Sequence, residues 1–179
     1  MAKKTLFLDR DGVINRQIIG GYVTSIQEFE FLPGVFEALS ILAEQFEYIF
    51  VITNQQGIGK NIFSVETLMQ IHNFMIQKIQ ENKGRIDKVY FCPDLEISNS
   101  INRKPNPGMG LNAFLDYPNI DLNQAIMVGD SFLDVQFGKN LGIKTAYLTH
   151  LKPYDKELAN IADGLFVDLL DFAAHQSIL

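Results

Sequence analysis

TLFLDRDGVIN, residues 5–15, is the stretch that decides the fold. Its apolar run, Leu6 to Leu8, has the character of a short buried strand, and Asp9 and Asp11 follow directly, ahead of a glycine. Two acids one residue apart repel each other. The pair becomes reasonable if a divalent cation lies between them, or if one acid attacks phosphorus while the other carries a proton. Taken alone, the pair also fits an ordinary strand exit with solvated aspartates, so the rest of the chain must decide.

The composition is that of a globular protein. The chain has 179 residues, of which 47% are hydrophobic and 20% charged, and this predicts a single domain over residues 1–179. The net charge of -6 argues against nucleic-acid binding, and the single cysteine excludes an internal disulfide. There is no secretory-signal pattern and no apolar run near the ~20 residues of a membrane span. We expect a soluble, cytoplasmic protein without a nucleic-acid or membrane partner, and a monomer by default.

Short apolar runs alternate with helical patterns along the chain. This order predicts an α/β fold, namely a Rossmann-like, three-layer α/β/α arrangement around a mostly parallel sheet. The segments 16–32 and 93–102 are irregular and too short for a second domain, but either could cover a site. The strands are expected at 6–8, 48–52, 88–91, 125–128, 145–148 and 165–167, and the helices at 35–46, from Ser64 to Lys83, from Pro107, from Ser131 to Gly142, after Pro153 and after Asp168.

A second polar segment, TNQQGIGK at 53–60, leaves the strand expected at 48–52. The Thr53 hydroxyl and the amides beside it can hold phosphate oxygens without adding charge. A glycine-rich turn with polar residues explains the segment equally well when it is taken alone.

A third segment, RKPNPG at 103–108, places Arg103 and Lys104 before two prolines and a helix start. Cations are poorly placed against the positive end of a helix, which favours an anion nearby over a merely solvated basic pair. A lysine supplies a point charge for a phosphoryl group, and an arginine grips an oxyanion with its planar fork.

A fourth segment, GDSFLD at 129–134, puts Asp130 and Asp134 after a strand and on one side of a helix start. Helix capping is the alternative, and Asp130 suits it. The four segments together supply acids, a hydroxyl and a lysine at expected strand ends, and chance assembly of that set is implausible.

The four segments resemble, in order and type, the four motifs of the haloacid dehalogenase superfamily of phosphotransferases. DRDGVIN is similar to the first motif, Thr53 to the second, Lys104 to the third, and Gly129-Asp130 with Asp134 to the fourth. The residues of these motifs, together with GGYV at 20–23, TNQQGIG and RKPNPGM, are similar to those of the histidinol-phosphatase and D,D-heptose 1,7-bisphosphate phosphatase group. The resemblance implies a magnesium-dependent phosphatase with a minimal cap. Its expected substrate is a small phosphorylated metabolite, heptose 1,7-bisphosphate ahead of histidinol phosphate or another sugar phosphate.

The resemblance also implies residue roles. Asp9 would attack phosphorus and form an aspartyl-phosphate, and Asp11 would act as general acid and then as general base. Mg²⁺ would be held by Asp9, the backbone carbonyl of Asp11 and Asp130. The acid at position 11 favours phosphate-ester cleavage over dehalogenation, because a halide leaves without a proton.

The remaining roles implied by the resemblance concern the phosphate and its surroundings. Thr53 would donate to a phosphoryl oxygen, and Lys104 would offset the negative charge. Asp134 would orient Lys104 or a metal-bound water. Asn54 and Arg103 would bind the substrate.

The chain departs from this group in two places. Relatives carry a zinc loop of the form CxH followed by CxC, whereas here the positions hold Cys92, Asp94, Ser100 and Asn102. Only one thiolate remains, so we expect no zinc and a looser 93–102 loop unless packing fixes it. Relatives of the heptose type have lysine where this chain has Ser131, and magnesium binding should survive that change because Asp9 and Asp130 remain.

Two other classes of protein are weighed against an enzyme. A receiver-like signalling domain also combines aspartates, a threonine and a lysine, but its phosphorylated aspartate is expected in mid-chain. A non-catalytic phosphometabolite-binding protein is disfavoured because every matched position keeps its reactive residue. His72 lies in a helical pattern, where a surface or hydrogen-bonded structural position is expected.

Overall fold

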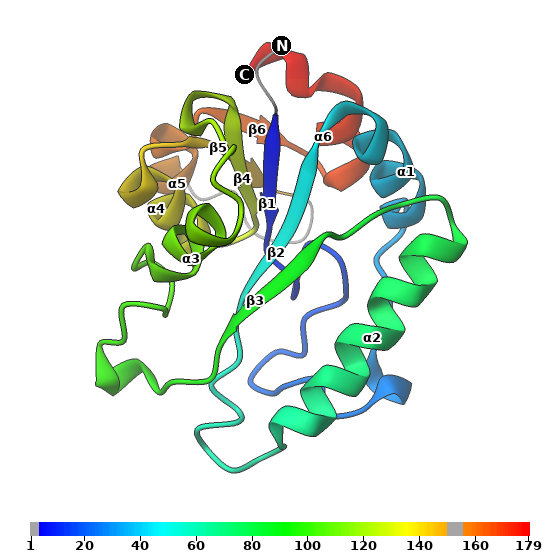
Figure 1. Ribbon diagram of the computed structural model, residues 1–179, viewed down its shortest axis with the longest axis vertical. Coiled ribbons are helices and arrows are strands. Elements are labelled where there is room, and N and C mark those ends of the chain that lie inside the picture. The colour runs from blue at the N-terminus through cyan, green and yellow to red at the C-terminus, as the bar shows by residue number, and fades with distance from the viewer. Residues whose placement is uncertain (1–3, 150–155) are drawn as a thin grey trace.

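The computed structural model describes residues 4–149 and 156–179, and a six-stranded sheet runs through its centre (Figure 1). The strand order is β3-β2-β1-β4-β5-β6, and every neighbouring pair is parallel. The predicted α/β fold is therefore confirmed. The strands are β1 (Thr5–Leu8), β2 (Tyr48–Asn54), β3 (Lys88–Cys92), β4 (Ala125–Gly129), β5 (Lys144–Leu148) and β6 (Gly164–Phe166).

Helices cover both faces of the sheet (Figure 1). Side chains of α1, α2 and α6 pack in one core with Leu6 and Leu8 of β1, whereas α3 and α4 pack in a second core with Phe7. The α-helices are α1 (Val35–Gln45), α2 (Val65–Glu81), α3 (Gly108–Asp116), α4 (Phe132–Leu141), α5 (Lys156–Ile161) and α6 (Leu169–His175), and short 3-10 turns occupy Ile26–Glu28, Glu96–Ser98, Leu122–Gln124 and Gln176–Ile178.

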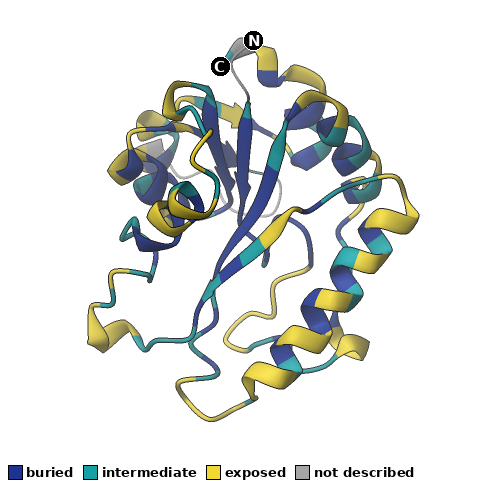
Figure 2. Ribbon diagram, in the orientation of Figure 1, coloured by how far each residue is buried: buried dark blue, intermediate teal, exposed yellow. Residues whose placement is uncertain are grey.

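Burial on both faces explains the apolar runs of the strands. All four residues of β1 are buried, and Figure 2 shows the central strands buried while the outer helices turn exposed residues to solvent. A strand with helices on both sides buries the side chains of both its faces, so its sequence is mostly apolar and shows no polar alternation. The helix boundaries follow capping chemistry. Ser64 accepts a hydrogen bond from the Thr67 N–H at the start of α2, and Gly142, with φ of 73°, ends α4.

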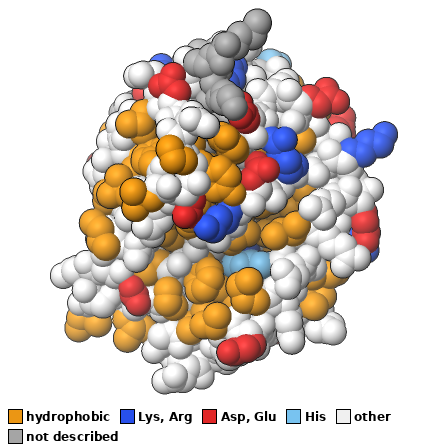
Figure 3. Space-filling view, in the orientation of Figure 1, with side chains coloured by type: hydrophobic (Ala, Val, Ile, Leu, Met, Phe, Trp, Pro, Cys, Tyr) orange, Lys and Arg blue, Asp and Glu red, His pale blue; other side chains and the backbone are white. Residues whose placement is uncertain are grey.

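The edge strand β3 lies on the face shown in Figure 3, where hydrophobic side chains gather with charged ones among them. Lys88 of β3 pairs with Asp116 at the end of α3, with 2.6 Å between Nζ and Oδ2. A charged side chain on an edge strand disfavours pairing with another sheet. In the described part of the chain, no helix combines the length and the apolar character that crossing a membrane requires.

One boundary differs from the prediction in a way that affects the site. The strand expected to end at 52 continues to Asn54, because Thr53 and Asn54 pair with Phe91 and Cys92 of β3. Their side chains therefore project from regular strand and not from a turn. The helix expected after Pro153 is observed as α5, although Pro153 itself lies outside the described residues.

The sheet order creates a crevice beside β1. From β1 the chain passes to β2 and β3 on one side, and from β4 it passes to β5 and β6 on the other. Ligands of open parallel sheets bind at such a switch point, beyond the carboxyl ends of the strands. The Asp9 N–H donates to the carbonyl of Val128 at 3.0 Å, so β1 and β4 remain paired up to the residues that enter the crevice.

Candidate active site

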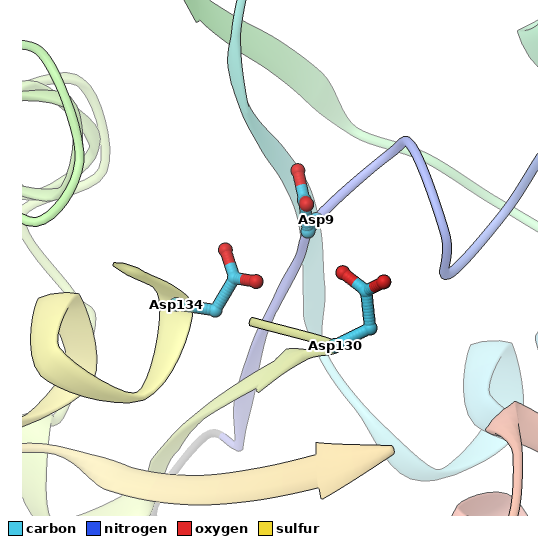
Figure 4. A group of neighbouring side chains, drawn as sticks. All are labelled: Asp9, Asp130 and Asp134. Atoms are coloured by element: carbon cyan, nitrogen blue, oxygen red, sulfur yellow. The ribbon is translucent and has the colours of Figure 1, made fainter. Parts of the chain in front are cut away.

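Three carboxylates meet in this crevice (Figure 4). Asp9 follows β1, Asp130 follows β4 and Asp134 lies in the first turn of α4, and one oxygen from each lies within 4.8 Å of the others. All three residues are buried. Gly12, with φ of 93°, lets the loop after β1 lie directly against the Asp130 carboxylate, because a Cβ at position 12 would overlap that carboxylate.

Lys104 supplies the positive charge of the cluster. Its buried ammonium lies 2.8 Å from Asp9 Oδ1 and 2.6 Å from Asp134 Oδ1. Although burial favours the neutral amine, these two charges raise the pKa of Lys104 above its usual value. Asn54 fixes the loop that carries the lysine, because its side-chain amide donates to the Lys104 carbonyl and accepts from the Lys104 N–H.

Asp134 connects the lysine to the start of α4. Its Oδ1 accepts from Lys104, while its Oδ2 accepts from the backbone N–H and the hydroxyl of Ser131, at 3.1 and 2.5 Å. Ser131 is the N-cap residue of α4, so the capping alternative weighed for Asp130 is wrong. Asp130 precedes the cap and projects into the crevice instead.

Asp9 is strongly perturbed by its surroundings. Burial raises its pKa to about 8, and the neighbouring carboxylates, above all Asp134, add to the effect against the opposing charge of Lys104. Three carboxylates face one ammonium, so a divalent cation would balance the local charge. Clustered carboxylate oxygens are the donors that Mg²⁺ prefers. The residues present therefore fit a magnesium ion.

Asp11 has a different environment from Asp9. Its Oδ1 accepts from Arg10 NH2 at 2.8 Å and from Asn15 Nδ2 at 2.9 Å, and its Oδ2 accepts from Gln55 Nε2 at 2.9 Å. Burial alone would raise the pKa of Asp11, but the Arg10 charge and these hydrogen bonds lower it. The pKa shifts of the two acids thus run in opposite directions, and without a metal they favour a proton on Asp9, the reverse of the order that a nucleophile at Asp9 and an acid at Asp11 require. A cation bound beside Asp9 would lower the pKa of that carboxyl.

A pocket of about 440 Å³ opens over these residues. Thr53 lines it and is buried, with its hydroxyl oxygen accepting from Gln55 at 2.9 Å. The 16–32 segment contributes to the wall, as expected for one of the two segments that could cover a site. The lining includes Asp9, Arg10, Asp11, Gln17, Ile18, Gly20 to Val23, Thr53 to Gln56, Lys60, Arg103, Lys104, Asp130, Ser131 and Leu133.

The structure thus brings Asp9, Asp11, Thr53, Asn54, Arg103, Lys104, Asp130 and Asp134 to one end of the sheet. Sequence reasoning missed the polar contacts behind them. Gln55 links Asp11 to Thr53, and Arg10 links Asp11 to His72. No spacing pattern in the sequence indicated these contacts, although the amide run at 54–56 marked the strand from which Gln55 comes.

The loop of Cys92 has hydrogen bonds where the sequence departs from a zinc motif. Cys92 Sγ lies 3.6 Å from Asp94 Oδ2 and 3.9 Å from Ser100 Oγ, and burial raises the pKa of the thiol. Asn106 Nδ2 donates to the Ser100 carbonyl at 2.9 Å, which ties the loop to the segment beyond Lys104. The expected absence of zinc stays a prediction.

The fold and the site define a class of protein: a parallel α/β enzyme with a carboxylate cluster and a lysine at its topological switch point, suited to phosphoryl transfer. The chain belongs to the haloacid dehalogenase-like hydrolase family, whose match covers residues 14–148. Within that family it is a phosphatase, an enzyme that hydrolyses phosphate monoesters.

Two curated relatives are named as heptose-1,7-bisphosphate 7-phosphatases. The chain is 36% identical to the D-glycero-alpha-D-manno-heptose-1,7-bisphosphate 7-phosphatase of Mycobacterium bovis, over 94% of this chain and 88% of the relative. It is 37% identical to the corresponding D-glycero-beta-D-manno enzyme of Vibrio cholerae, over 83% and 82%. The crystal structure of D,D-heptose 1,7-bisphosphate phosphatase from B. bronchiseptica, complexed with magnesium and phosphate, aligns with a TM-score of 0.86 at 27% identity, over 98% of both chains.

Proposed function

We propose that the protein is a magnesium-dependent phosphatase that removes the 7-phosphate of a heptose 1,7-bisphosphate by way of an aspartyl-phosphate on Asp9. The observation that carries the proposal is the cluster of Asp9, Asp130 and Asp134, in which Lys104 pairs with Asp9 and Asp134 and from which Asp9, Lys104 and Asp130 line the pocket. The names of the relatives support the substrate, and the magnesium and phosphate held by the related crystal structure support the cofactor.

In the first step Asp9 attacks the phosphorus and the sugar alkoxide leaves. Both hydrogen bonds that the described residues donate to the Asp9 side chain, from the Arg10 N–H and from Lys104 Nζ, end on Oδ1. Oδ2 is therefore the oxygen that remains for attack. Lys104 uses two of its three N–H donors on Asp9 and Asp134, and the third serves a phosphoryl oxygen.

Thr53 and Asp11 complete that step. Because the Thr53 oxygen accepts from Gln55, its own hydroxyl proton is available for a phosphoryl oxygen. Asp11 gives its proton to the leaving alkoxide. The negative charge of the arriving phosphate raises the proton affinity of Asp11 and so favours the acid form that this step needs.

In the second step Asp11 takes a proton from water, which attacks the aspartyl-phosphate and releases Asp9 and inorganic phosphate. Asp9, Asp130 and the backbone carbonyl of Asp11 would hold Mg²⁺, and the bound ion would neutralise charge on the phosphoryl oxygens. Asp134 keeps Lys104 directed at the nucleophile through its 2.6 Å contact.

A bisphosphate needs positive charge away from the reacting phosphate. Lys60 and Arg103 line the pocket, and neither is part of the carboxylate cluster. Lys60 Nζ lies 5.6 Å from the centre of the Tyr22 ring, so the lysine faces the wall formed by the 16–32 segment. Both cations can meet the second phosphate of the substrate.

The test is phosphate release by the purified protein with Mg²⁺ from a panel of sugar and amino-alcohol phosphates. We expect heptose 1,7-bisphosphate to give the highest kcat/KM, and Asp9→Asn to abolish turnover because an amide is a poor nucleophile. Release from none of the panel contradicts the phosphatase proposal. A preference for histidinol phosphate leaves the mechanism intact and replaces the heptose substrate.

A further inference from the structure

Arg10 is a buried cation that the mechanism above does not use. It follows the nucleophile in sequence, yet its side chain is among the largest that are fully buried, with 0% of the residue exposed. A buried charge is costly unless it is paired and hydrogen-bonded. The guanidinium NH2 donates to Asp11 Oδ1 at 2.8 Å, and its centre lies 5.9 Å from the centre of the Phe29 ring.

The other arm of the guanidinium reaches His72. NH1 lies 3.1 Å from Nε2 of His72. His72 is in the middle of α2, 62 positions after Arg10 in the sequence. Arginine can only donate hydrogen bonds, so Nε2 must accept and the ring proton must lie on Nδ1. His72 is 2% exposed and packs on the buried face of α2, so its position is set by the helix.

We infer that Arg10 and His72 are positioning residues that fix the orientation of the Asp11 carboxylate through the contacts His72–Arg10 and Arg10–Asp11. The inference rests on the proposed role of Asp11 as acid and base. The forked guanidinium spans the two contacts in one rigid plane, which a lysine could not do.

The contacts decide which oxygen of Asp11 handles the proton. Oδ1 accepts from both Arg10 and Asn15, whereas Oδ2 accepts only the Gln55 amide, which also contacts Thr53. Oδ2 is thus the less saturated oxygen and lies on the side of the phosphate-binding hydroxyl. It gives its proton to the leaving alkoxide in the first step and takes one from water in the second.

The test compares two substrates that differ in their need for an acid. A sugar alkoxide leaves only if it is protonated, whereas 4-nitrophenolate leaves without a proton, so its first-turnover release bypasses the acid function of Asp11. His72→Leu removes the hydrogen-bond acceptor, and His72→Gln restores one near the position of Nε2. Arg10→Lys keeps the charge without the fork and tests the same contacts at their centre. Ile79→Ala is the matched control, because it is a buried residue of the same helix about 10 Å further along.

We expect His72→Leu to lower kcat for heptose 1,7-bisphosphate by about tenfold or more with little change in KM, and to change first-turnover nitrophenolate release by less than about threefold. Arg10→Lys should show the same selectivity, His72→Gln should recover most of the lost kcat, and Ile79→Ala should lower only thermal stability. If His72→Leu lowers kcat for heptose 1,7-bisphosphate and the rate of nitrophenolate release equally, or if the folded variant has unchanged kinetics, the inference is overturned. The proposed function is unaffected by either result as long as the wild type is active. A wild type inactive on both substrates contradicts the proposed function itself and the inference with it.

Discussion

At the scale of single residues, Lys104 holds the carboxylate cluster together. Its ammonium is the only positive side chain in contact with Asp9 and Asp134 among the described residues, and it is almost fully buried. Removing one partner from a buried ion pair is strongly destabilising, because it leaves an uncompensated charge in the interior. The lysine therefore supports both the fold and the proposed chemistry.

Replacing this lysine separates the two contributions. We expect Lys104→Met to lower the free energy of unfolding by on the order of 3 kcal/mol, because it leaves two buried carboxylates without their partner. The change should also lower kcat by at least about 100-fold through the lost donor. Chemical denaturation and steady-state kinetics measure the two effects.

Lys88→Met is the control for Lys104→Met. Lys88 makes an equally short contact of 2.6 Å, with Asp116, but its side chain is 44% exposed. An exposed pair contributes little, so we expect no more than about 0.5 kcal/mol and unchanged kinetics. Similar effects of the two substitutions would contradict the role assigned to the buried lysine.

At the scale of elements, the start of α4 is coupled to the site. Ser131 caps the helix and donates its hydroxyl to Asp134 Oδ2, and the other oxygen of that carboxylate receives Lys104. The lysine that the resemblance to the heptose-type relatives leads one to expect at 131 is absent, but the serine in its place contributes to holding Asp134. A change at this helix end should thus reach the nucleophile through one side chain.

Ser131→Ala tests this coupling. We expect a loss of about 1 kcal/mol in the free energy of unfolding, as for other helix N-caps, together with a several-fold drop in kcat because Asp134 loses one of its donors. Ser64→Ala is the matched variant. It removes the cap of α2, where the Ser64 hydroxyl accepts from the Thr67 N–H, and should cost similar stability without a change in kcat. Equal kinetics in the two variants would show that the cap and the site are independent.

The strands and helices also show how much of the fold and the site could be predicted from the sequence. The inner strands β1, β2, β4 and β5 were predictable because burial on both faces favours uninterrupted apolar runs, and Asp9, Thr53 and Asp130 were found because each lies at the carboxyl end of such a run. The contact between Arg10 and His72 was not predictable. It joins residues 62 positions apart. The sequence shows only a histidine within a helical pattern, which fits an exposed or a structural histidine equally well, and the structure places it on the buried face of α2.

At the scale of the whole molecule, the strand order turns separate motifs into one site. The first, third and fourth motifs follow β1, β3 and β4, and the second lies at the end of β2. Because β1 and β4 are neighbours, the first and fourth motifs share the crevice. The same order concentrates negative charge at one end of the sheet, in a protein whose net charge is already -6. Stability should therefore depend on the cation that the cluster binds.

Magnesium removal should consequently destabilise the protein in a pH-dependent way. Burial and the neighbouring carboxylates raise the pKa of Asp9 to about 8 from 3.8, so the metal-free fold holds a proton that the unfolded chain loses near pH 4. The contribution of this group to stability is greatest below pH 4 and is lost as the pH rises toward 8. Mg²⁺ replaces the proton, and its stabilising effect should therefore be larger at pH 8 than at pH 6.

Thermal unfolding with Mg²⁺ and with a chelator measures this dependence. At pH 8, Mg²⁺ at about 100 times its Kd should add about 2.7 kcal/mol, which raises Tm by roughly 5–10 °C for a chain of this size. Asp130→Asn removes one carboxylate from the cluster, so its metal-free form should be at least as stable as the metal-free wild type, with little further gain from Mg²⁺. A Tm shift of the same size in the variant and the wild type would contradict metal binding at Asp130. A larger shift at pH 6 than at pH 8 would contradict displacement of the Asp9 proton by the metal.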